Sequence, residues 1–442
     1  MQTLGNHRFL VLGSGGREHA LCWRLSQPDH SEGQRRQHAV YAAPGNPGIA
    51  KIVTCAPIPL NDFQAIAQFC LDQGIDVVVV GPEQPLVEGI ANYFAARPDL
   101  AAIKVLGPNK ACAQLEGSKA FSKAFMARHN IPTAAYQEFT QADLAACLAY
   151  IQTQQLPIVI KADGLAAGKG VIIAQSYPEA AEAVTEMLSG EAFGAAGERV
   201  VIEQFLDGKE LSYFVLADGK GHYLTLPQAK DYKRIGVGDT GLNTGGMGTI
   251  SPVPFADEAM LAAVDATIVR PTLAGLEAEG LHYVGFLFIG LMVVDGKPFV
   301  IEYNCRLGDP ETQSLMMRLG PDLADAFVAA ANGELSTWEG RSLSTTDHPV
   351  CTVVLASGGY PGTFEKGLQI SGHETSLGLP DIEVFHAGTA LDADGKLVTA
   401  GGRVLAVSAT ASTWPDTIAL AQSAAATINW EGRYYRTDIG VV

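Results

Sequence analysis

Short apolar runs alternate with amphipathic, helix-like segments over the first quarter of the chain. The runs FLVLG, AVYAA, VVVVG and IKVLG are separated by segments such as residues 17–25 and 63–72, in which apolar positions recur with helical spacing. Alternation of β-rich runs with helices is typical of an open sheet covered by helices. The pattern predicts an N-terminal, Rossmann-like α/β domain over residues 1–108, which ends at Gly107-Pro108.

The middle of the chain shows two further patterns. A helical stretch over residues 110–129 leads into the runs LPIVIKADG, GKGVIIA and ERVVIEQFLDG, with a helix at 178–188, and this order predicts a small lid-like subdomain at about residues 130–200. The segments LSYFVLADGKGHYLTL and GFLFIGLMVVDGKPFVIEYN each turn on Asp-Gly, the strongest short hairpin signal. We therefore expect a domain with an antiparallel core over residues 109–334.

The last quarter of the chain predicts a β-rich C-terminal domain over residues 335–442. It contains the run VCTVVLASGG, a third Asp-Gly hairpin at Asp394-Gly395 and an Ala-rich helix over residues 417–428. A chain of 442 residues with 47% hydrophobic content is large enough to form several cores. The expected fold class is thus a multidomain protein with α/β and α+β parts.

Composition excludes several classes of protein. The formal net charge of −17 and the lack of a Lys/Arg run argue against a nucleic-acid partner. No apolar stretch approaches the ~20 residues needed to span a bilayer. The seven cysteines form no CxxC pair, so we expect a soluble cytoplasmic protein with reduced thiols and no membrane contact. The oligomeric state is left open, with a monomer among the alternatives.

The segment GSGGREHA at residues 13–20 predicts an anion site. It follows a predicted strand and opens a helix, where backbone N–H groups and the helix dipole favour a phosphate. Glu18 stands at the third glycine position of the dinucleotide fingerprint, which argues against an NAD-dependent oxidoreductase. A tight turn that only joins a strand to a helix is the alternative.

Two later motifs indicate a nucleotide. ADGLAAGKG at residues 162–170 lacks the spacing and the Ser/Thr of a P-loop, but a glycine-rich hairpin can lie over phosphates while Lys161 and Lys169 neutralise them. VIEQFLDGKE at residues 201–210 can offer its backbone to an adenine edge and Glu210 to ribose hydroxyls. The alternatives are a mobile surface loop and an ordinary acidic strand end.

The strand PFVIEYNCRLGDPE carries the most specific chemistry. Period-two spacing puts Glu302, Asn304 and Arg306 on one face, with Cys305 turned towards the core. Carboxylate and amide oxygens suit Mg²⁺ or Mn²⁺, and a guanidinium can grip a carboxylate or a phosphate. The alternative is a surface salt bridge between Glu302 and Arg306.

A glycine-rich loop is expected over residues 239–248, DTGLNTGGMG. Such a loop allows a close backbone approach to a ligand, and its N–H groups could meet an oxyanion. KDYKR at residues 230–234, just before it, offers charges to a phosphorylated substrate, or is simply a solvated charge run.

In chain order, GSGGREHA, GPEQPLVEGI, QLEGSKAFSK, VIKADGLAAGKGV, IEQFLDGKELS, NTGGMG, IEYNCRLGDPET and ASGGYPG closely resemble the phosphoribosylamine–glycine ligase family of purine biosynthesis. The resemblance covers nearly the whole chain. It implies an ATP-grasp fold and a ligase that joins glycine to 5-phosphoribosylamine, giving glycinamide ribonucleotide, ADP and phosphate, with Mg²⁺ or Mn²⁺. Lys230, Tyr232 and Leu242 depart from the Gln, His and Pro usual in the family, which puts the finer contacts of the ribosylamine pocket in doubt.

The resemblance also implies site residues. The expected metal ligands are Glu302 and Asn304. The expected ATP contacts are Lys119, Lys161, Gly168, Lys169, Gly170, Glu203, Gln204, Leu206 and Glu210, with the adenine hinge at 203–206. The expected substrate contacts are Gly15, Gly16, Arg17, Glu18, Gly81, Pro82, Glu83, Lys233, Gly308 and Asp309. The expected catalytic residues are Arg306, Asp231, Lys161 and Gly246.

The expected reaction runs through a glycyl phosphate. The glycine carboxylate would attack the γ-phosphate, and the ribosylamine nitrogen would then attack the activated carbonyl while Arg306 and N–H groups near Gly246 stabilise the oxyanion and Asp231 orients or deprotonates the amine. Another ATP-grasp carboxylate–amine ligase, or a non-catalytic nucleotide-binding module, is the alternative.

Overall fold

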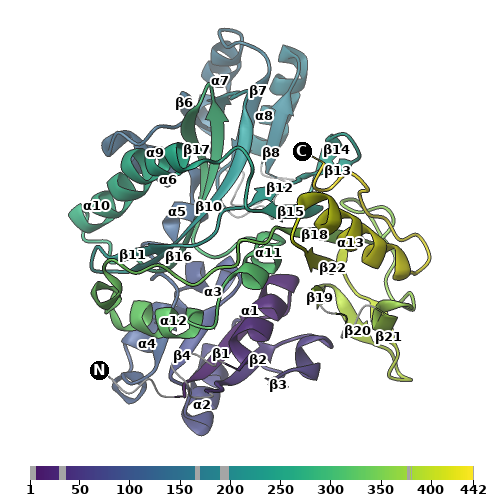
Figure 1. Ribbon diagram of the computed structural model, residues 1–442. Helices are drawn as coiled ribbons and strands as arrows, with labels where there is room; N and C mark the ends of the chain where they lie inside the picture. Colours follow the sequence, from purple (N-terminus) through teal and green to yellow (C-terminus); the bar gives the residue numbers. More distant parts are fainter. Residues whose placement is uncertain are drawn as a thin grey trace.

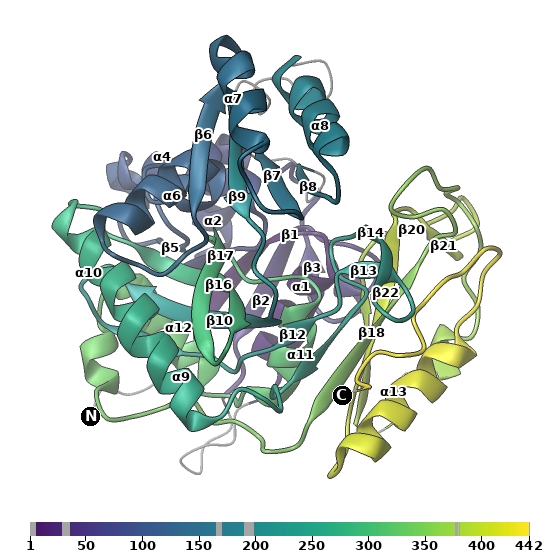
Figure 2. The same cartoon turned by 90° about the horizontal axis from the view of Figure 1, so that it is seen from above.

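The computed structural model describes residues 6–28, 36–164, 170–189, 199–375, 379 and 381–441. Three bodies surround a central antiparallel sheet (Figures 1 and 2). The N-terminal strands lie at the bottom of Figure 1, a four-stranded lid sheet lies at the top, and the C-terminal strands lie to the right. The expected mixture of a parallel α/β domain with antiparallel sheets is confirmed.

The N-terminal sheet is parallel and has the order β3-β2-β1-β4-β5. Its strands are β1 (Arg8–Gly13), β2 (Ala39–Pro44), β3 (Thr54–Cys55), β4 (Val77–Val80) and β5 (Lys104–Leu106). Its helices are α1 (Gly16–Ser26), α2 (Phe63–Gln73), α3 (Glu83–Glu88) and α4 (Ile90–Ala95). The strand order reverses between β1 and β4. Parallel sheets bind ligands at such a switch point, beyond the carboxyl ends of the strands.

The lid sheet is antiparallel and has the order β6-β9-β7-β8. Its elements are β6 (Tyr136–Thr140), α7 (Leu144–Ile151), β7 (Ile158–Ala162), β8 (Val171–Ala174), α8 (Tyr177–Ser189) and β9 (Arg199–Gln204). Its two helices pack against each other and enclose a separate small apolar core with the sheet. Gly168 and Lys169, which were predicted to contact ATP, lie outside the described residues.

The helix expected over residues 110–129 is two helices, α5 (Gln114–Gly117) and α6 (Lys119–Arg128). Ser118 separates them with an extended backbone, φ −141° and ψ 119°, and its hydroxyl accepts the N–H of Phe121 as an N-cap. Capping by serine favours a helix start over continuation. This break turns the start of α6 towards the lid.

The central sheet has the order β11-β10-β16-β17 and confirms the two predicted hairpins. Its strands are β10 (Lys209–Asp218), β11 (Tyr223–Thr225), β16 (Val284–Val294) and β17 (Lys297–Asn304). A helical run over α9 (Glu258–Val264), a π-turn (Asp265–Val269) and α10 (Arg270–Ala278) packs on this sheet. By length and composition alone this run would pass as a membrane span, a test that core helices also pass.

The C-terminal sheet crosses the boundary predicted at residue 335. Its order is β12-β15-β18-β22-β19, so two strands that precede the boundary share a sheet with three that follow it, through the pairing of β15 with β18. These strands are β12 (Lys230–Asp231), β15 (Gly248–Ser251), β18 (Val350–Ala356), β19 (Ile382–His386) and β22 (Arg403–Thr410). α11 (Glu311–Arg318), α12 (Leu323–Asn332) and α13 (Trp414–Thr427) are the remaining long helices of the described chain.

Two small hairpins and several one-turn helices complete the described structure. The hairpins are β13 (Arg234–Gly236) with β14 (Thr240–Asn243), and β20 (Thr389–Leu391) with β21 (Leu397–Thr399). The 3₁₀ turns are Ile49–Lys51, Pro98–Leu100, Gln141–Asp143, Leu335–Trp338 and His373–Thr375. The expectation of a glycine-rich loop over residues 239–248 is therefore wrong for β14, which pairs antiparallel with β13 through a shift in register between Arg234 and Gly236.

Candidate active site

A cavity of about 1210 Å³ lies where the lid, the central sheet, the N-terminal domain and the C-terminal sheet meet. Its wall includes most residues predicted from the sequence. They are Arg17, Pro82, Glu83, Lys119, Lys161, Gly170, Glu203, Gln204, Leu206, Glu210, Asp231, Lys233, Glu302, Asn304, Arg306, Gly308 and Asp309. Gly15, Gly16, Glu18, Gly81 and Gly246 do not line the wall but lie behind it.

Two buried lysines share one carboxylate under the lid. Glu203 Oε1 lies 2.9 Å from Lys161 Nζ and Glu203 Oε2 lies 3.0 Å from Lys123 Nζ. Burial lowers the pKa of Lys123 to about 8, although the attraction of Glu203 opposes this shift. The Glu203 carboxylate therefore orients the lysines, and only the hinge backbone after it is left to meet a nucleobase. Sequence reasoning missed Lys123, although it stands one helical turn after Lys119.

Glu302 and Asn304 present oxygen atoms to the cavity from β17. Burial raises the pKa of the Glu302 carboxyl, but Lys233, Lys161 and Lys119 outweigh burial and hold it below its usual range. No cluster of three or more His, Cys, Asp or Glu side chains occurs in the described ranges. An ionised carboxylate with one amide fits a hard divalent cation that takes its other ligands from phosphates and water.

Lys233 stands beside Glu302 in the cavity wall. Its Nζ lies 3.1 Å from Glu210 Oε2 and 4.0 Å from Glu302 Oε1. Burial lowers the pKa of Lys233, but the two carboxylates and Asp231 raise it more, so the net pKa lies above its usual range. Glu210, which was predicted to contact ribose, thus holds a lysine in this structure.

Arg306 is fixed by two acids. Its Nη2 donates to Glu116 Oε1 at 2.8 Å and its Nε donates to Glu83 Oε2 at 3.3 Å. Nη2 also reaches Asn304 Oδ1 at 3.2 Å, whereas the salt bridge to Glu302 considered from the sequence is not formed. Glu116, which sequence reasoning missed although its motif was noted, also accepts the N–H of the buried Cys305. The guanidinium is therefore a fixed positive charge in the wall.

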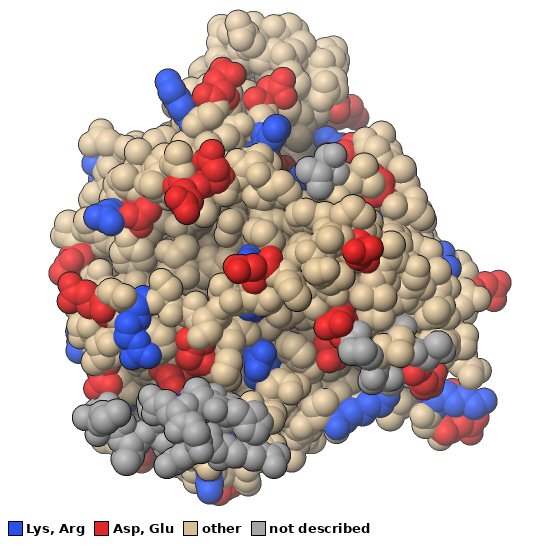
Figure 3. Space-filling view, viewed as in Figure 1, with Lys and Arg blue, Asp and Glu red and all other residues tan. Residues whose placement is uncertain are grey.

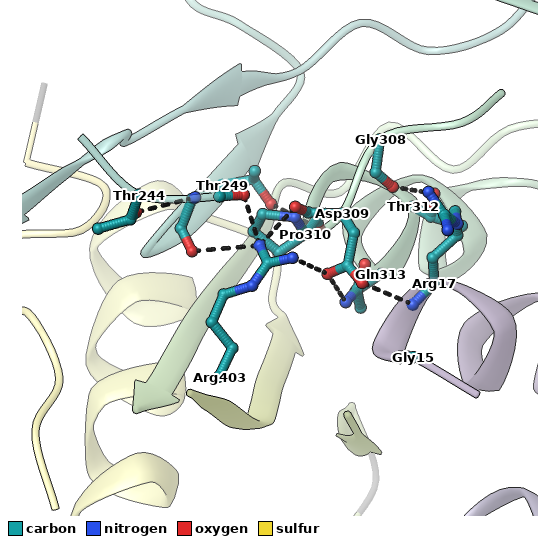
Figure 4. Close-up of polar contacts among 12 residues, drawn as sticks. Gly15, Arg17, Thr244, Thr249, Gly308, Asp309, Pro310, Thr312, Gln313 and Arg403 are labelled. Atoms are coloured by element: carbon teal, nitrogen blue, oxygen red, sulfur yellow. Dashed lines mark hydrogen bonds and ion pairs between the residues drawn. The ribbon is translucent and has the colours of Figure 1, made fainter. Parts of the chain in front are cut away.

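The turn before α1 lies at the switch point of the N-terminal sheet. Gly15 N donates to Glu18 Oε2 at 2.6 Å. Arg17 N donates to Asp309 Oδ2 at 3.3 Å (Figure 4). A Cβ added at Gly81 would lie 2.1 Å from Glu18 Oε1, so the two glycine motifs of this domain meet over one carboxylate. In this structure two of the N–H groups at which a phosphate was predicted, those of Gly15 and Arg17, donate to carboxylates.

Two buried carboxyl groups stand near each other at the inner end of the cavity. Burial, and then repulsion by Glu311, raises the pKa of Asp231. The pKa of Glu311 is also raised, chiefly by burial, and Ser212 Oγ donates to its Oε1 at 3.1 Å. Asp231 Oδ1 is buried without a hydrogen-bond partner in the described structure. Both carboxyl residues line the cavity wall. Sequence reasoning missed Glu311.

The N–H groups of the turn around Gly246 are all engaged within the protein. Gly245 N donates to Tyr360 Oη, Gly246 N to Thr244 Oγ1, and Met247 N to the carbonyl oxygen of Tyr232. The expectation that these groups wait for an oxyanion does not fit this geometry. Gly246 instead closes over Asp231, because a Cβ there would lie 2.6 Å from Asp231 Oδ1.

Comparisons with known proteins agree along the whole chain. The phosphoribosylglycinamide synthetase N domain matches residues 7–116, the ATP-grasp domain of that family matches residues 117–312, and its C domain matches residues 350–442. The phosphoribosylamine–glycine ligase of Pasteurella multocida is 47% identical over 98% of this chain and 97% of its own length. That of Rhizobium meliloti is 48% identical, with 98% of each chain covered.

Solved structures give the same picture. The crystal structure of the phosphoribosylamine–glycine ligase of Thermotoga maritima superposes with a TM-score of 0.80 at 35% identity, covering 98% of this chain and 100% of the other. The biotin carboxylase domain of the Hydrogenobacter thermophilus 2-oxoglutarate carboxylase, solved with MgADP, has a TM-score of 0.68 at 18% identity, covering 97% of this chain and 91% of the other. This second likeness concerns the fold alone.

Proposed function

The chain belongs to the phosphoribosylglycinamide synthetase family, and we propose that its cavity joins glycine to 5-phosphoribosylamine with conversion of ATP to ADP and phosphate. This proposal rests mainly on one observation. The two lysines under the lid, Lys123 and Lys161, line the same cavity as Glu302 and Asn304 and as residues at the N-terminal switch point. The full-length match disfavours another ATP-grasp ligase. A non-catalytic module would not need to keep Lys161, Glu302 and Asn304 together.

ATP is proposed to bind between the lid and the central sheet. The hinge backbone after Glu203 and the side chains of Lys119 and Lys161 line the cavity. We assign the backbone to the adenine and the two lysines to the phosphates. A Mg²⁺ or Mn²⁺ ion held by Glu302 and Asn304 would neutralise charge on the phosphate oxygens. Lysines that are already oriented by protein acceptors need little reorganisation when a phosphate arrives.

In the first step, a glycine carboxylate oxygen attacks the γ-phosphorus and the bond to the β-phosphate oxygen breaks. The products are glycyl phosphate and ADP. Arg306 is proposed to hold the glycine carboxylate, because its guanidinium is fixed by Glu83 and Glu116 and lines the wall. Acyl phosphates hydrolyse readily, so the lid has to exclude water at this stage.

In the second step, the ribosylamine nitrogen attacks the glycyl carbonyl and phosphate leaves. The amine loses a proton in this step, and the Asp231 and Glu311 pair, which lines the cavity, is proposed to accept it. Two adjacent buried carboxyl groups hold one proton more readily than two negative charges. Arg306 supplies positive charge near the carbonyl oxygen. Arg17 and the N-terminal switch point are proposed to receive the 5-phosphate.

An omission experiment tests the proposal. Phosphate release from ATP is measured with glycine and with phosphoribosylamine generated in situ, and each substrate is left out in turn. We expect full turnover only when all three substrates are present, with glycinamide ribonucleotide formed in the same amount as phosphate. Sustained phosphate release without ribosylamine, or with another amine at the same rate, would contradict the assignment.

A further inference from the structure

Arg403 reaches the cavity wall from the C-terminal sheet, and sequence reasoning did not single it out. It is the first residue of β22, and its guanidinium lies between the Gly245–Gly246 turn and Asp309 (Figure 4). Nη1 donates to the carbonyl oxygens of Gly245 and Asp309 and, at 3.4 Å, to that of Gly246. Nη2 lies 3.5 Å from Asp309 Oδ1.

Arg403 and the groups that its guanidinium contacts come from three parts of the fold. The Gly245–Gly246 turn leads into β15, and Asp309 follows β17 of the central sheet. Asp309 in turn accepts hydrogen bonds from Arg17 N at 3.3 Å and from Gln313 Nε2 at 2.9 Å. Figure 4 shows Asp309 between Arg403 and the start of α1. One side chain of the C-terminal domain thus connects the inner turn of the cavity with the N-terminal switch point.

The turn that Arg403 holds lies directly on the carboxyl pair. Gly246 has φ +111°, and a Cβ at this residue would lie 2.6 Å from Asp231 Oδ1 and 2.4 Å from Pro310 Cδ. A peptide unit is planar, so a guanidinium that fixes the carbonyl of Gly245 also fixes the orientation of the following N–H and Cα. A displaced turn would alter the space over the unpartnered oxygen of Asp231.

We propose that Arg403 is a positioning residue of the ligation step, through which the C-terminal domain seats the Gly245–Gly246 turn over Asp231 and fixes Asp309 against α1. The end of the cavity that receives the ribosylamine is then complete only when the C-terminal sheet is in place. This inference rests on the proposed function. It assigns Arg403 to the second, amine-dependent step and not to ATP binding, because its contacts lie on the side of Asp231 and Arg17.

The test compares two arginines of the same domain in the full chain. Arg403→Met removes the guanidinium, and Arg403→Lys keeps a charge that cannot contact several carbonyls in the same geometry. Arg433→Met is the matched control, because Arg433 Nη1 also donates to main-chain carbonyls, those of Ala425 at 3.0 Å and Ile428, but lies outside the cavity wall. Thermal unfolding of all variants measures the purely structural cost.

We expect Arg403→Met to lower the turnover of the complete reaction by about 10-fold or more and to raise KM for ribosylamine, while KM for ATP changes by about twofold at most. Glycine-dependent positional isotope exchange in ATP, which reports glycyl phosphate formation, should stay within about threefold of wild type. The turnover of Arg403→Lys should lie between that of Arg403→Met and that of wild type. Arg433→Met should keep wild-type kinetics, even if its unfolding temperature falls by as much as that of Arg403→Met.

Two results would overturn the inference. One is turnover of Arg403→Met within about twofold of wild type. The other is an equal loss in isotope exchange and in the complete reaction, which would place Arg403 in the first step or in general stability. Failure of the proposed function is distinguishable, because it would appear in the wild-type chain as phosphate release that does not depend on ribosylamine.

Discussion

At the residue scale, Gly246 is the position where backbone conformation and site geometry coincide. Its φ of +111° disfavours any side chain, and an added Cβ would collide with Pro310 and Asp231. We expect Gly246→Ala to lower the free energy of unfolding by about 2–4 kcal/mol, from backbone strain together with the clash, and to reduce turnover. Urea unfolding and steady-state kinetics measure the two effects.

Gly280→Ala is the control for this prediction. Gly280 also has a positive φ, +71°, but no atom lies within 4 Å of its added Cβ. Gly280→Ala should lower the free energy of unfolding only through backbone conformation, by about 1 kcal/mol, and leave turnover unchanged. Equal losses in the two variants would mean that contact with Asp231 and Pro310 does not matter.

Glu302 is the residue on which the metal assignment depends. Glu302→Gln keeps the shape of the side chain and removes the charge, so the loss of a metal ligand worth several kcal/mol should lower turnover by about 100-fold or more. Binding of Mn²⁺ in the presence of ADP, followed by electron paramagnetic resonance, should weaken in parallel. Glu258→Gln, at the exposed start of α9, should change neither. Unaltered Mn²⁺ binding by Glu302→Gln would contradict the assignment.

The residues that sequence reasoning missed share one property. Lys123, Glu116, Glu311 and Arg403 act through partners that are far away in the chain: Arg403 and Asp309 are 94 residues apart, and Glu116 and Arg306 are 190 apart. A spacing pattern shows which residue types lie on one face of one element, and this suffices for Glu302 and Asn304 on β17. The spacing pattern does not show which other element of the fold will pack against that face.

At the element scale, local pairings were predictable from the sequence and pairings between distant segments were not. The hairpin β16–β17 was predictable because Asp295 and Gly296 both have positive φ, 48° and 74°, and this pair of residues adopts that conformation at low cost. The pairing of β15 with β18 was not predictable, because it joins segments about a hundred residues apart by registers that no local pattern encodes. The three-domain plan from the sequence therefore did not anticipate the shared sheet.

A chain of buried hydroxyl groups links the shared sheet with helix α11. Thr249 Oγ1 lies 2.8 Å from Ser314 Oγ, which lies 2.7 Å from Thr352 Oγ1, which lies 2.7 Å from Ser408 Oγ. All four residues are fully buried. Thr352→Val keeps the shape but leaves two neighbours short of a partner, so unfolding free energy should fall by about 1–3 kcal/mol. Denaturant unfolding measures this loss.

Thr345→Val is the matched change outside the chain of hydroxyls, because Thr345 is exposed. It should alter stability by less than about 0.5 kcal/mol. If Thr352→Val is as stable as wild type, the hydroxyl chain does not bind β15 and β18 together, and apolar packing alone holds the shared sheet.

At the scale of the whole molecule, the cavity belongs to no single domain. Its wall takes Arg17 and Glu83 from the N-terminal domain, Lys161 from the lid, Glu302 from the central sheet and Arg403 from the C-terminal sheet. Charges of both signs are interspersed over the face shown in Figure 3, without a basic patch on that face. The cavity wall nevertheless carries positive side chains suited to phosphates, including Arg17, Lys119, Lys161 and Arg306, although the chain as a whole has a net charge of −17.

The contact between the N-terminal and C-terminal domains contains buried histidines. The His386 N–H donates to His19 Nδ1 at 2.7 Å, and the ring centroids lie 5.6 Å apart. Burial, and then the positive charge of Lys51, lowers the pKa of His19 to about 3. Burial, and then the neighbouring His19 and Lys51, lowers the pKa of His386 to about 2. The ring centroids of His373 and His386 lie 6.2 Å apart, and burial also lowers the pKa of His373.

These shifts predict a domain contact that weakens in mild acid. In the unfolded chain a histidine has a pKa near about 6.5, so below that pH the unfolded state binds protons that the folded state refuses. The stabilisation is therefore complete above pH ~6.5 and is lost as pH falls towards the folded-state values, by about 3 kcal/mol for the pair between pH 7.5 and 5.5.

The double variant His19→Asn/His386→Asn keeps an acceptor at the Nδ1 position and cannot titrate, so its urea unfolding should depend on pH much less over this window. His282→Asn, at an exposed position, should keep the wild-type slope. An unchanged slope in the double variant would show that these rings are protonated in the folded protein without cost, and that acid lability arises elsewhere.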